Sequence, residues 1–243
     1  MKLIKADHQR RIEIAGVAEP VQRPVDMDRS QTGFAVLRSL RIYRFDKGSV
    51  IDGHAEEDEV LIVVMAGSVE LSMMDHNSAN NPRPFTLSAA GESRSDPCAA
   101  YLPPTAGYRL VAQSDAEVAY ARATPAGGRP SHVFQSNPGS YQSGVTLLLE
   151  ENNYPQLLRL RLLQIKAAQH DISVLPIQKA EDKCEAFVHV RTIPSEGVAT
   201  ITREPAAQTP LASWDTVAVM PGDSPTLTFK AGTSALVLVV LTT

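Results

Sequence analysis

Histidine and acidic side chains crowd a short stretch in the first third of the chain. His54 and Glu56 are followed by Glu59, and an unbroken apolar run begins at residue 60. Imidazole nitrogens and carboxylates that converge on one point can bind a divalent metal ion or a polar ligand. The alternative is a solvated acidic loop at the entrance of a strand, and the usual exposure of acidic side chains favours that interpretation.

Glu185 and His189 form a second candidate site in the last third of the chain. They lie four residues apart in a segment whose composition predicts a strand, so both side chains are expected on one face. A carboxylate and an imidazole on one face can act as a catalytic acid and base pair. The alternative is that Glu185 is solvated at the strand end and His189 is a hydrogen-bonded, partly buried side chain.

Two tyrosines complete the candidate ligand-binding residues. Tyr101 and Tyr108 lie at the two ends of the segment YLPPTAGY and could line the mouth of the first half. Arg109 could bind a carboxylate there through its planar guanidinium group. Alternation along a strand places Tyr108 and Arg109 on opposite faces, and we expect Tyr108 to face inward.

The elements that must position these side chains are short β-strands. Residues 60–65 are all apolar and rich in β-branched side chains, and Gly67 follows closely. Because six residues are too few for a stable helix, this run predicts a buried strand. Similar runs separated by turns continue to the end, with no convincing helix of average length. Residues 144–169 fit a helix or two strands, and Pro155 favours strand, turn, strand. Before residue 33 we expect an extended lead-in with one short strand near residues 12–15.

Composition and charge exclude several classes of function. The 243 residues carry a formal net charge of -4, which offers no electrostatic basis for nucleic-acid binding. No apolar run approaches the roughly 18 residues needed to cross a membrane, and no signal peptide is expected. Cys98 and Cys184 lack the spacing of a disulfide framework or a zinc ribbon, so a reduced cytoplasmic location is expected.

The two halves of the chain repeat the same order of parts. Glu59 opens a strand whose following turn ends in Gly67, and Glu185 opens a strand whose following turn ends in Gly197. A proline-rich turn, expected to join a hairpin, comes next in each half. Two jelly rolls in one chain explain this order most simply.

A stretch dense in glycine, proline and serine separates the repeats. It covers residues 124–139 and is the best candidate for a domain boundary. We therefore expect one jelly roll with its lead-in over residues 1–128 and a second jelly roll over residues 129–243.

The motifs of the first half resemble those of the cupins. One set of residues resembles the first cupin motif: Gly48, His54, Glu56, Glu59 and Gly67. The segment YLPPTAGYRL resembles the second cupin motif. In this segment Tyr108 stands about where cupins usually have a metal-binding histidine. More narrowly, EVLIVVMAG, YLPPTAGYRLVAQSDAEVA and SHVFQSNP resemble the family of 5-deoxyglucuronate isomerase, an enzyme of myo-inositol catabolism. The resemblance implies an all-β fold of two cupin-type jelly-roll β-barrels, a bicupin.

The resemblance also implies which metal ligands are missing from the second half. It places Gln178 and Ala180 on two metal-binding histidines, Glu185 on the metal-binding glutamate and Ser224 on the last histidine. Because only the glutamate is kept, no metal or other cofactor is expected, although a divalent metal is the disfavoured alternative.

Two functions follow from these observations. One is a sugar-acid isomerase that interconverts aldose and ketose by moving a proton between adjacent carbons. The other is a degenerate bicupin without catalysis that acts as a small-molecule-binding, regulatory or structural protein. The expected ligand of the protein is a small carbohydrate or a sugar acid. A homodimer is also expected, because a partner subunit often covers exposed edge strands.

Overall fold

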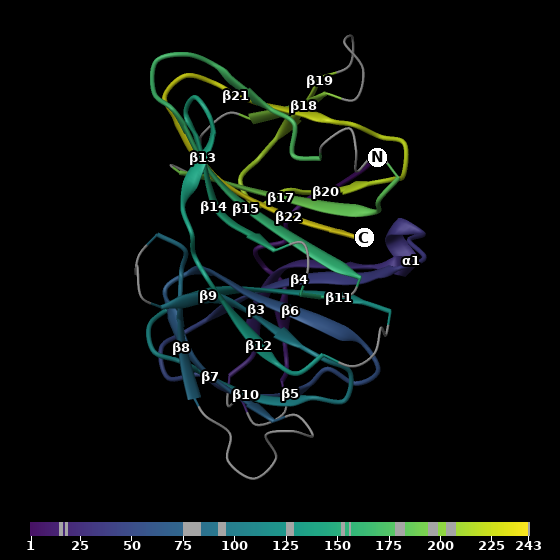
Figure 1. Ribbon diagram of the computed structural model, residues 1–243, viewed down its shortest axis with the longest axis vertical. Coiled ribbons are helices and arrows are strands. Elements are labelled where there is room, and N and C mark those ends of the chain that lie inside the picture. The colour runs from purple at the N-terminus through teal and green to yellow at the C-terminus, as the bar shows by residue number, and fades with distance from the viewer. Residues whose placement is uncertain are drawn as a thin grey trace.

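The protein consists of four β-sheets stacked as two sandwiches, one from each half of the chain (Figure 1). The computed structural model describes residues 1–14, 17, 19–74, 84–91, 96–124, 129–151, 154–155, 157–177, 183–193, 199–202 and 208–242. Within these residues the only helix is a single turn, α1 (Arg29–Thr32). The prediction of an all-β chain of two jelly rolls is confirmed, and each half is a pair of facing sheets.

The first half contains one sheet of seven strands and one of four. The seven-stranded sheet has the order β12 (His132–Gln135), β9 (Pro97–Leu102), β6 (Glu59–Ala66), β11 (Ala116–Ala123), β4 (Leu37–Phe45), β3 (Val21–Asp28), β2 (Arg11–Ile12). The four-stranded sheet has the order β5 (Val50–His54), β10 (Gly107–Ala112), β7 (Ser68–Met74), β8 (Pro84–Ser88). Neighbouring strands pair antiparallel, and an apolar core fills the space between the sheets.

The second half repeats this arrangement. Its seven-stranded sheet has the order β1 (Lys2–Ile4), β20 (Thr216–Val219), β17 (Ala186–Ile193), β22 (Thr233–Thr242), β15 (Leu158–Ala167), β14 (Val145–Glu151), β13 (Gly139–Gln142). Its four-stranded sheet has the order β16 (Ile172–Val174), β21 (Thr226–Phe229), β18 (Ala199–Thr202), β19 (Gln208–Leu211). The two halves therefore correspond strand by strand, as the repeated order of sequence motifs predicts.

The first strand of each half lies on the sheet of the other half. β1 pairs with β20 at the edge of the second half's sheet, and β12 pairs with β9 at the edge of the first half's sheet. The two halves therefore exchange their first strands, as the subunits of a strand-swapped dimer do. The boundary after residue 128 stays a prediction, and the strand pairing places residues 132–135 with the first half.

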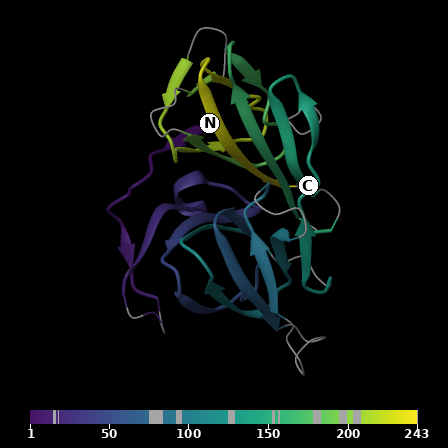
Figure 2. The same cartoon turned by 90° about the vertical axis from the view of Figure 1, so that its left-hand side faces the viewer.

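The two seven-stranded sheets pack face to face in the middle of the molecule (Figures 1 and 2). Their shared core contains Met27, Leu40, Ile42, Leu61 and Val63 from the first half and Leu160, Leu162, Phe187, Leu238 and Val240 from the second. Each of these sheets also covers the core of its own sandwich, so its central strands are buried on both faces. Burial on both faces explains why β6 and β22 are nearly continuous apolar runs rather than alternating patterns.

Several local predictions can be compared with these strands. β14 and β15 confirm strand, turn, strand over residues 144–169. The lead-in was predicted wrongly, because β3 occupies eight of its residues. Pro24 fits into β3 where the register shifts between Gln22 and Val25, a place where its missing N–H interrupts no regular ladder. The proline-rich turns do not close hairpins, since each one joins strands of different sheets.

Candidate functional site

The seven-stranded sheets present their side chains either to the interior of their own sandwich or to the interface between the halves. In β6, Val60 and Ile62 point to the interior, whereas Leu61 and Val63 point to the interface. In β17, Val188 and Val190 point to the interior and Phe187 to the interface. Residues of odd number in both strands therefore face the other half, including the two glutamates that precede or open them.

Glu59 and Glu185 bind the backbone of the opposite half. One oxygen of Glu59 accepts hydrogen bonds from the N–H groups of Leu157 and Leu158, both at 2.7 Å. The two oxygens of Glu185 accept three hydrogen bonds, from the N–H groups of residues 35, 36 and 37, at 2.5, 2.9 and 2.8 Å. Both carboxylates are buried. They satisfy backbone donors at the start of β4 and β15, so we interpret them as reciprocal structural contacts between the halves.

The proposed acid and base pair of the second half is corrected by this geometry. Glu185 and His189 do share a face, as their spacing predicts, but it is the face toward the first half. His189 is 1% exposed, and its Nδ1 lies 3.0 Å from the hydroxyl of Thr216. Burial, with a smaller contribution from Arg191, lowers the pKa of His189 to about 3. The imidazole is therefore a neutral packed side chain with no access to a ligand in the sandwich interior.

Tyr101 also belongs to the interface rather than to the mouth of the first half. Its side chain is fully buried, and its hydroxyl donates to the second oxygen of Glu59 at 3.4 Å. The predicted ligand-binding roles of Tyr101 and Glu59 are therefore replaced by one structural contact.

A cavity of about 200 Å³ opens at the mouth of the first half, and it contains the other predicted residues His54 and Tyr108. Its lining is completed by Ile14, Ser39, Arg41, Tyr43, Phe45, Ile51, Asp52, Gly53, Tyr120 and Arg122. As alternation predicts, Tyr108 faces inward, whereas Arg109 is half exposed and pairs with Asp52 at 3.0 Å. We take this first-half cavity as the candidate functional site.

Aromatic rings form one wall of the first-half cavity. Tyr43 lies edge-on to Tyr120 at a centroid distance of 5.3 Å and stacks on Phe45 at 5.6 Å. The ring centroids of Tyr108 and Tyr120 lie 6.0 Å apart. Burial raises the pKa of Tyr108 to about 12, and burial likewise raises the pKa of Tyr120 well above its ordinary value. Both phenols are therefore protonated near neutral pH and can serve as hydrogen-bond donors.

Guanidinium groups supply positive charge to the same cavity. Arg122 contacts Glu56 at 3.2 Å and Asp58 at 3.5 Å, and it donates to the carbonyl oxygen of His54 at 2.6 Å. Glu56 is 73% exposed and does not line the cavity, so its predicted ligand-binding role becomes an indirect one through Arg122. Arg41 reaches the cavity from β4.

Sequence reasoning missed four of these residues, Arg41, Tyr43, Tyr120 and Arg122. A signal for them exists in the segments RIYRF and AYARA, where polar or aromatic residues alternate with apolar ones. The alternation predicts that these side chains share one face of the sheet, but it does not predict that this face borders a cavity.

Three lining residues of the first-half cavity have aliphatic counterparts in the second half. The strand registers align Tyr43 with Leu163, Tyr120 with Val239 and Arg122 with Leu241. Leu163 and Val239 are fully buried and Leu241 is 1% exposed. Ser224 is exposed, and Gln178 and Ala180 lie outside the described residues. At these three positions the duplicated fold is polar or aromatic in the first half and aliphatic in the second, whereas Arg41 keeps a charged counterpart, Arg161.

Comparison with known proteins adds a family to this geometry. The profile of the KduI/IolB family matches residues 17–142, slightly more than half of the chain. The chain belongs to the KduI/IolB family. The resemblance seen in the sequence motifs is thereby confirmed, and the matched residues include every side chain that lines the first-half cavity except Ile14. None of the curated proteins matches the chain.

Solved structures share the fold of this KduI/IolB family member at low identity. An IolB-like protein from Salmonella typhimurium is 14% identical, with a TM-score of 0.66 over 96% of this chain and 93% of that one. YlbA from E. coli is 11% identical, with a TM-score of 0.67 over 99% and 90%. Bacillus subtilis oxalate decarboxylase is 9% identical, with a TM-score of 0.65 over 99% and 76%. These similarities establish the cupin-type fold.

The side chains present do not fit a cupin-type metal centre. A solved structure of oxalate decarboxylase is described as containing Mn(II) centres. In this KduI/IolB family member, no three His, Cys, Asp or Glu side chains among the described residues form a group that could hold a metal ion. Glu59 faces the interface and Glu56 contacts Arg122, so neither of these two predicted carboxylates completes a metal site with His54.

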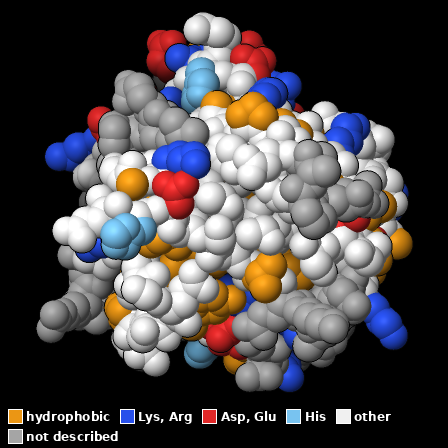
Figure 3. All heavy atoms as spheres, turned by 90° about the horizontal axis from the view of Figure 1, so that it is seen from above, with side chains coloured by type: hydrophobic (Ala, Val, Ile, Leu, Met, Phe, Trp, Pro, Cys, Tyr) orange, Lys and Arg blue, Asp and Glu red, His pale blue; other side chains and the backbone are white. Residues whose placement is uncertain are grey.

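The remaining predictions concern partners and location. No helix in the described ranges has the length and apolar character needed to cross a membrane. On the outer face of the second half, basic side chains lie scattered among acidic ones, with apolar groups between them (Figure 3). The homodimer, the cytoplasmic location and the absence of a nucleic-acid partner stay predictions.

Gly53 is expected to be essential for the shape of the first-half cavity. It pairs with Tyr108 across β5 and β10, and a Cβ atom at Gly53 would lie 2.3 Å from the tyrosine ring. Gly53→Ala should therefore displace the ring and lower the free energy of unfolding by about 1–3 kcal/mol, as overpacking usually does. Urea denaturation would measure this loss.

The matched control for this substitution is Gly139→Ala, because a Cβ there meets nothing within 4 Å and the backbone is not in the left-handed region. Its effect should be small, and the double variant Gly53→Ala/Tyr108→Leu should recover part of the loss. Equal losses at Gly53 and Gly139 would contradict the proposed contact.

Proposed function

We propose that the protein binds a small carbohydrate or sugar acid in the first-half cavity. The observation that carries this proposal is the combination of Tyr43, Tyr108 and Tyr120 with Arg41 and Arg122 around one cavity. Aromatic faces pack against the apolar face of a sugar ring, while phenol and guanidinium groups donate hydrogen bonds to hydroxyl and carboxylate oxygens.

The aliphatic counterparts in the second half support the assignment of one site per chain. The residues that correspond to Tyr43, Tyr120 and Arg122 are all aliphatic and buried there. If the fold itself required polar or aromatic side chains at these three positions, both halves would have them. The polar and aromatic side chains of the first half therefore need another reason. Ligand binding is the reason that we infer.

Isothermal titration calorimetry with D-glucuronate and D-glucose tests the proposal. The substitutions Tyr43→Leu and Tyr120→Val replace each tyrosine by the aliphatic residue found at the corresponding position of the second half. We expect the wild-type protein to bind at least one of the two sugars and the double variant to bind it at least about tenfold more weakly.

The matched control is Tyr141→Leu, a tyrosine of β13 far from this cavity in the strand order. Binding should be unchanged in this variant. Failure of both sugars to bind at millimolar concentration, or equal binding by the aliphatic double variant, would reject the proposal.

Membership of the KduI/IolB family favours a second candidate function, an aldose–ketose isomerase acting in the same cavity. Such an enzyme needs a base that is unprotonated near neutral pH. The high pKa of Tyr108 makes it a donor rather than this base, and the carboxylate of Asp52 is paired with Arg109, so we take the imidazole of His54 as the candidate base. Incorporation of solvent deuterium into the bound sugar, lost in His54→Gln, would support the isomerase. Binding without deuterium exchange would favour the non-catalytic function.

A further inference from the structure

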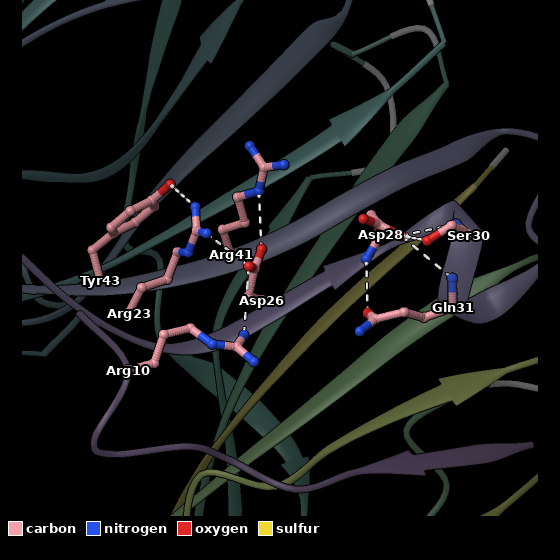
Figure 4. A network of polar contacts seen from close by, with 8 residues as sticks. All are labelled: Arg10, Arg23, Asp26, Asp28, Ser30, Gln31, Arg41 and Tyr43. Carbon is pink, nitrogen blue, oxygen red and sulfur yellow. Dashed lines mark hydrogen bonds and ion pairs between the residues drawn. The ribbon is translucent and has the colours of Figure 1, made fainter. Parts of the chain in front are cut away.

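Three arginines converge on a single aspartate beside the first-half cavity. Arg23 lies 2.7 Å, Arg41 3.2 Å and Arg10 3.4 Å from the carboxylate of Asp26. Figure 4 shows Asp26 enclosed by the three guanidinium groups, with Arg23 also pointing to the hydroxyl of Tyr43, 3.5 Å away. One carboxylate cannot neutralise three guanidinium groups, so this arginine cluster carries excess positive charge.

The arginine cluster is open to a ligand. The side chains of Arg10 and Arg41 are 36% and 37% exposed, and that of Arg23 is 18% exposed. Asp7 approaches Arg10 only at 3.9 Å and is 52% exposed, so it adds little compensation. In the described structure the Nε atom of Arg23 is buried and makes no hydrogen bond. An unused buried donor is costly unless a ligand or solvent oxygen accepts from it.

The second half shows that the fold itself does not require this cluster. The registers align Asp26 with Glu150 and Arg41 with Arg161, and Arg161 lies 2.8 Å from the carboxylate of Glu150. Arg161 also donates to the carbonyl oxygen of Pro176 and is only 1% exposed.

The two additional arginines have no basic counterparts. Arg10 and Arg23 correspond to Gly139 and Leu147 in the paired strands of the second half. The fold therefore does not require arginines at the positions of Arg10 and Arg23. The additional positive charge is confined to the half that has the polar cavity.

We propose that Arg10, Arg23 and Arg41 bind the phosphate group of a phosphorylated sugar whose ring occupies the first-half cavity. Arg41 and Tyr43 line the cavity and also belong to or contact the cluster, so one ligand can span both. Three guanidinium groups against the carboxylates of Asp26 and the more distant Asp7 leave an excess of one to two positive charges, which attracts a phosphate monoester of roughly -1.5 to -2 at pH 7. Guanidinium groups also match the geometry of phosphate oxygens. This inference rests on the proposed binding of a carbohydrate in the cavity.

Titration calorimetry with D-glucose, D-glucuronate, D-glucose 6-phosphate and inorganic phosphate tests the inference. We expect D-glucose 6-phosphate to bind at least about tenfold more tightly than either other sugar, and its affinity to fall as salt rises from 50 to roughly 200 mM. Arg23→Gln should weaken D-glucose 6-phosphate about tenfold or more, while the affinity for D-glucose stays within about twofold.

Arg29→Gln is the control, since it removes the same charge from an exposed position in α1. Equal affinity for the glucuronate and the phosphate ester, or an equal loss in Arg29→Gln, would overturn the phosphate assignment while leaving carbohydrate binding intact. Binding of inorganic phosphate without any sugar would overturn the combined site. Failure of every sugar would instead reject the proposed function.

Discussion

Glu185→Gln should lower the free energy of unfolding by about 2–4 kcal/mol, because buried backbone donors would lose their acceptor. The carboxylate uses both oxygens, one for the N–H of Ala35 and the other for the N–H groups of Val36 and Leu37. A glutamine amide offers only one oxygen, so its NH₂ group must face at least one of the three donors. The side chain is 8% exposed, which leaves little room for water to replace the lost acceptor.

The other half of the molecule provides the control for this prediction. Glu59 accepts from Leu157 and Leu158 with the same oxygen, while its second oxygen meets the hydroxyl of Tyr101. In Glu59→Gln the amide oxygen can keep both N–H groups and the NH₂ group can donate to the tyrosine oxygen. We expect less than half the loss of Glu185→Gln, measured by urea denaturation at pH 7. A larger loss at Glu59 would contradict the assigned hydrogen bonds.

The reciprocal glutamates show how far the sequence predicts this fold. Equivalent positions for Glu59 and Glu185 are visible in the repeated order of motifs, and strand alternation correctly puts Glu185 and His189 on one face. Alternation does not predict which face this is, because the central strands of both seven-stranded sheets are buried on both sides. With apolar residues on either face, the usual contrast between an inner and an outer side is missing.

The candidate site was predicted only where a residue type is unusual by itself. His54 and Tyr108 stand out as polar or aromatic residues beside turns, and both line the first-half cavity. Arg41 and Tyr43 lie in a strand whose partner, β3, was not expected, so nothing in the sequence indicated their neighbours. Arg10 reaches Asp26 through the pairing of β2 with β3, which the sequence pattern of the lead-in did not predict.

The strand exchange adds a physical reason why the halves act as one unit. β1 and β12 each complete the sheet of the other half, and the carboxylates of Glu59 and Glu185 bind the opposite backbone in both directions. Separation of the halves would expose two sheet edges, four or more unpaired polar groups and the shared apolar core at once. We therefore expect the whole described fold to unfold in one cooperative transition.

His189 should make the protein less stable as the pH falls below about 6.5, the ordinary pKa of an unfolded histidine. In the folded protein, burial beside Trp214 and Thr216 and the nearby charge of Arg191 lower its pKa to about 3. Between these two pKa values the unfolded chain binds a proton that the folded chain does not bind. Stability is therefore fully present well above pH 6.5 and is lost at about 1.4 kcal/mol per pH unit below it, or about 2 kcal/mol by pH 5.

Urea denaturation of the wild type and His189→Asn at pH 7.5 and pH 5 isolates this contribution from those of other groups. Asparagine can keep the hydrogen bond to Thr216 but does not titrate, although it loses the ring contact with Trp214. The variant should therefore be less stable than the wild type at pH 7.5, and the difference should shrink by about 2 kcal/mol at pH 5. His170→Asn, an exposed control, should leave the pH dependence unchanged. A difference between wild type and His189→Asn that stays constant with pH would mean that this imidazole is protonated in the folded protein, and the buried, neutral role assigned to His189 would be wrong.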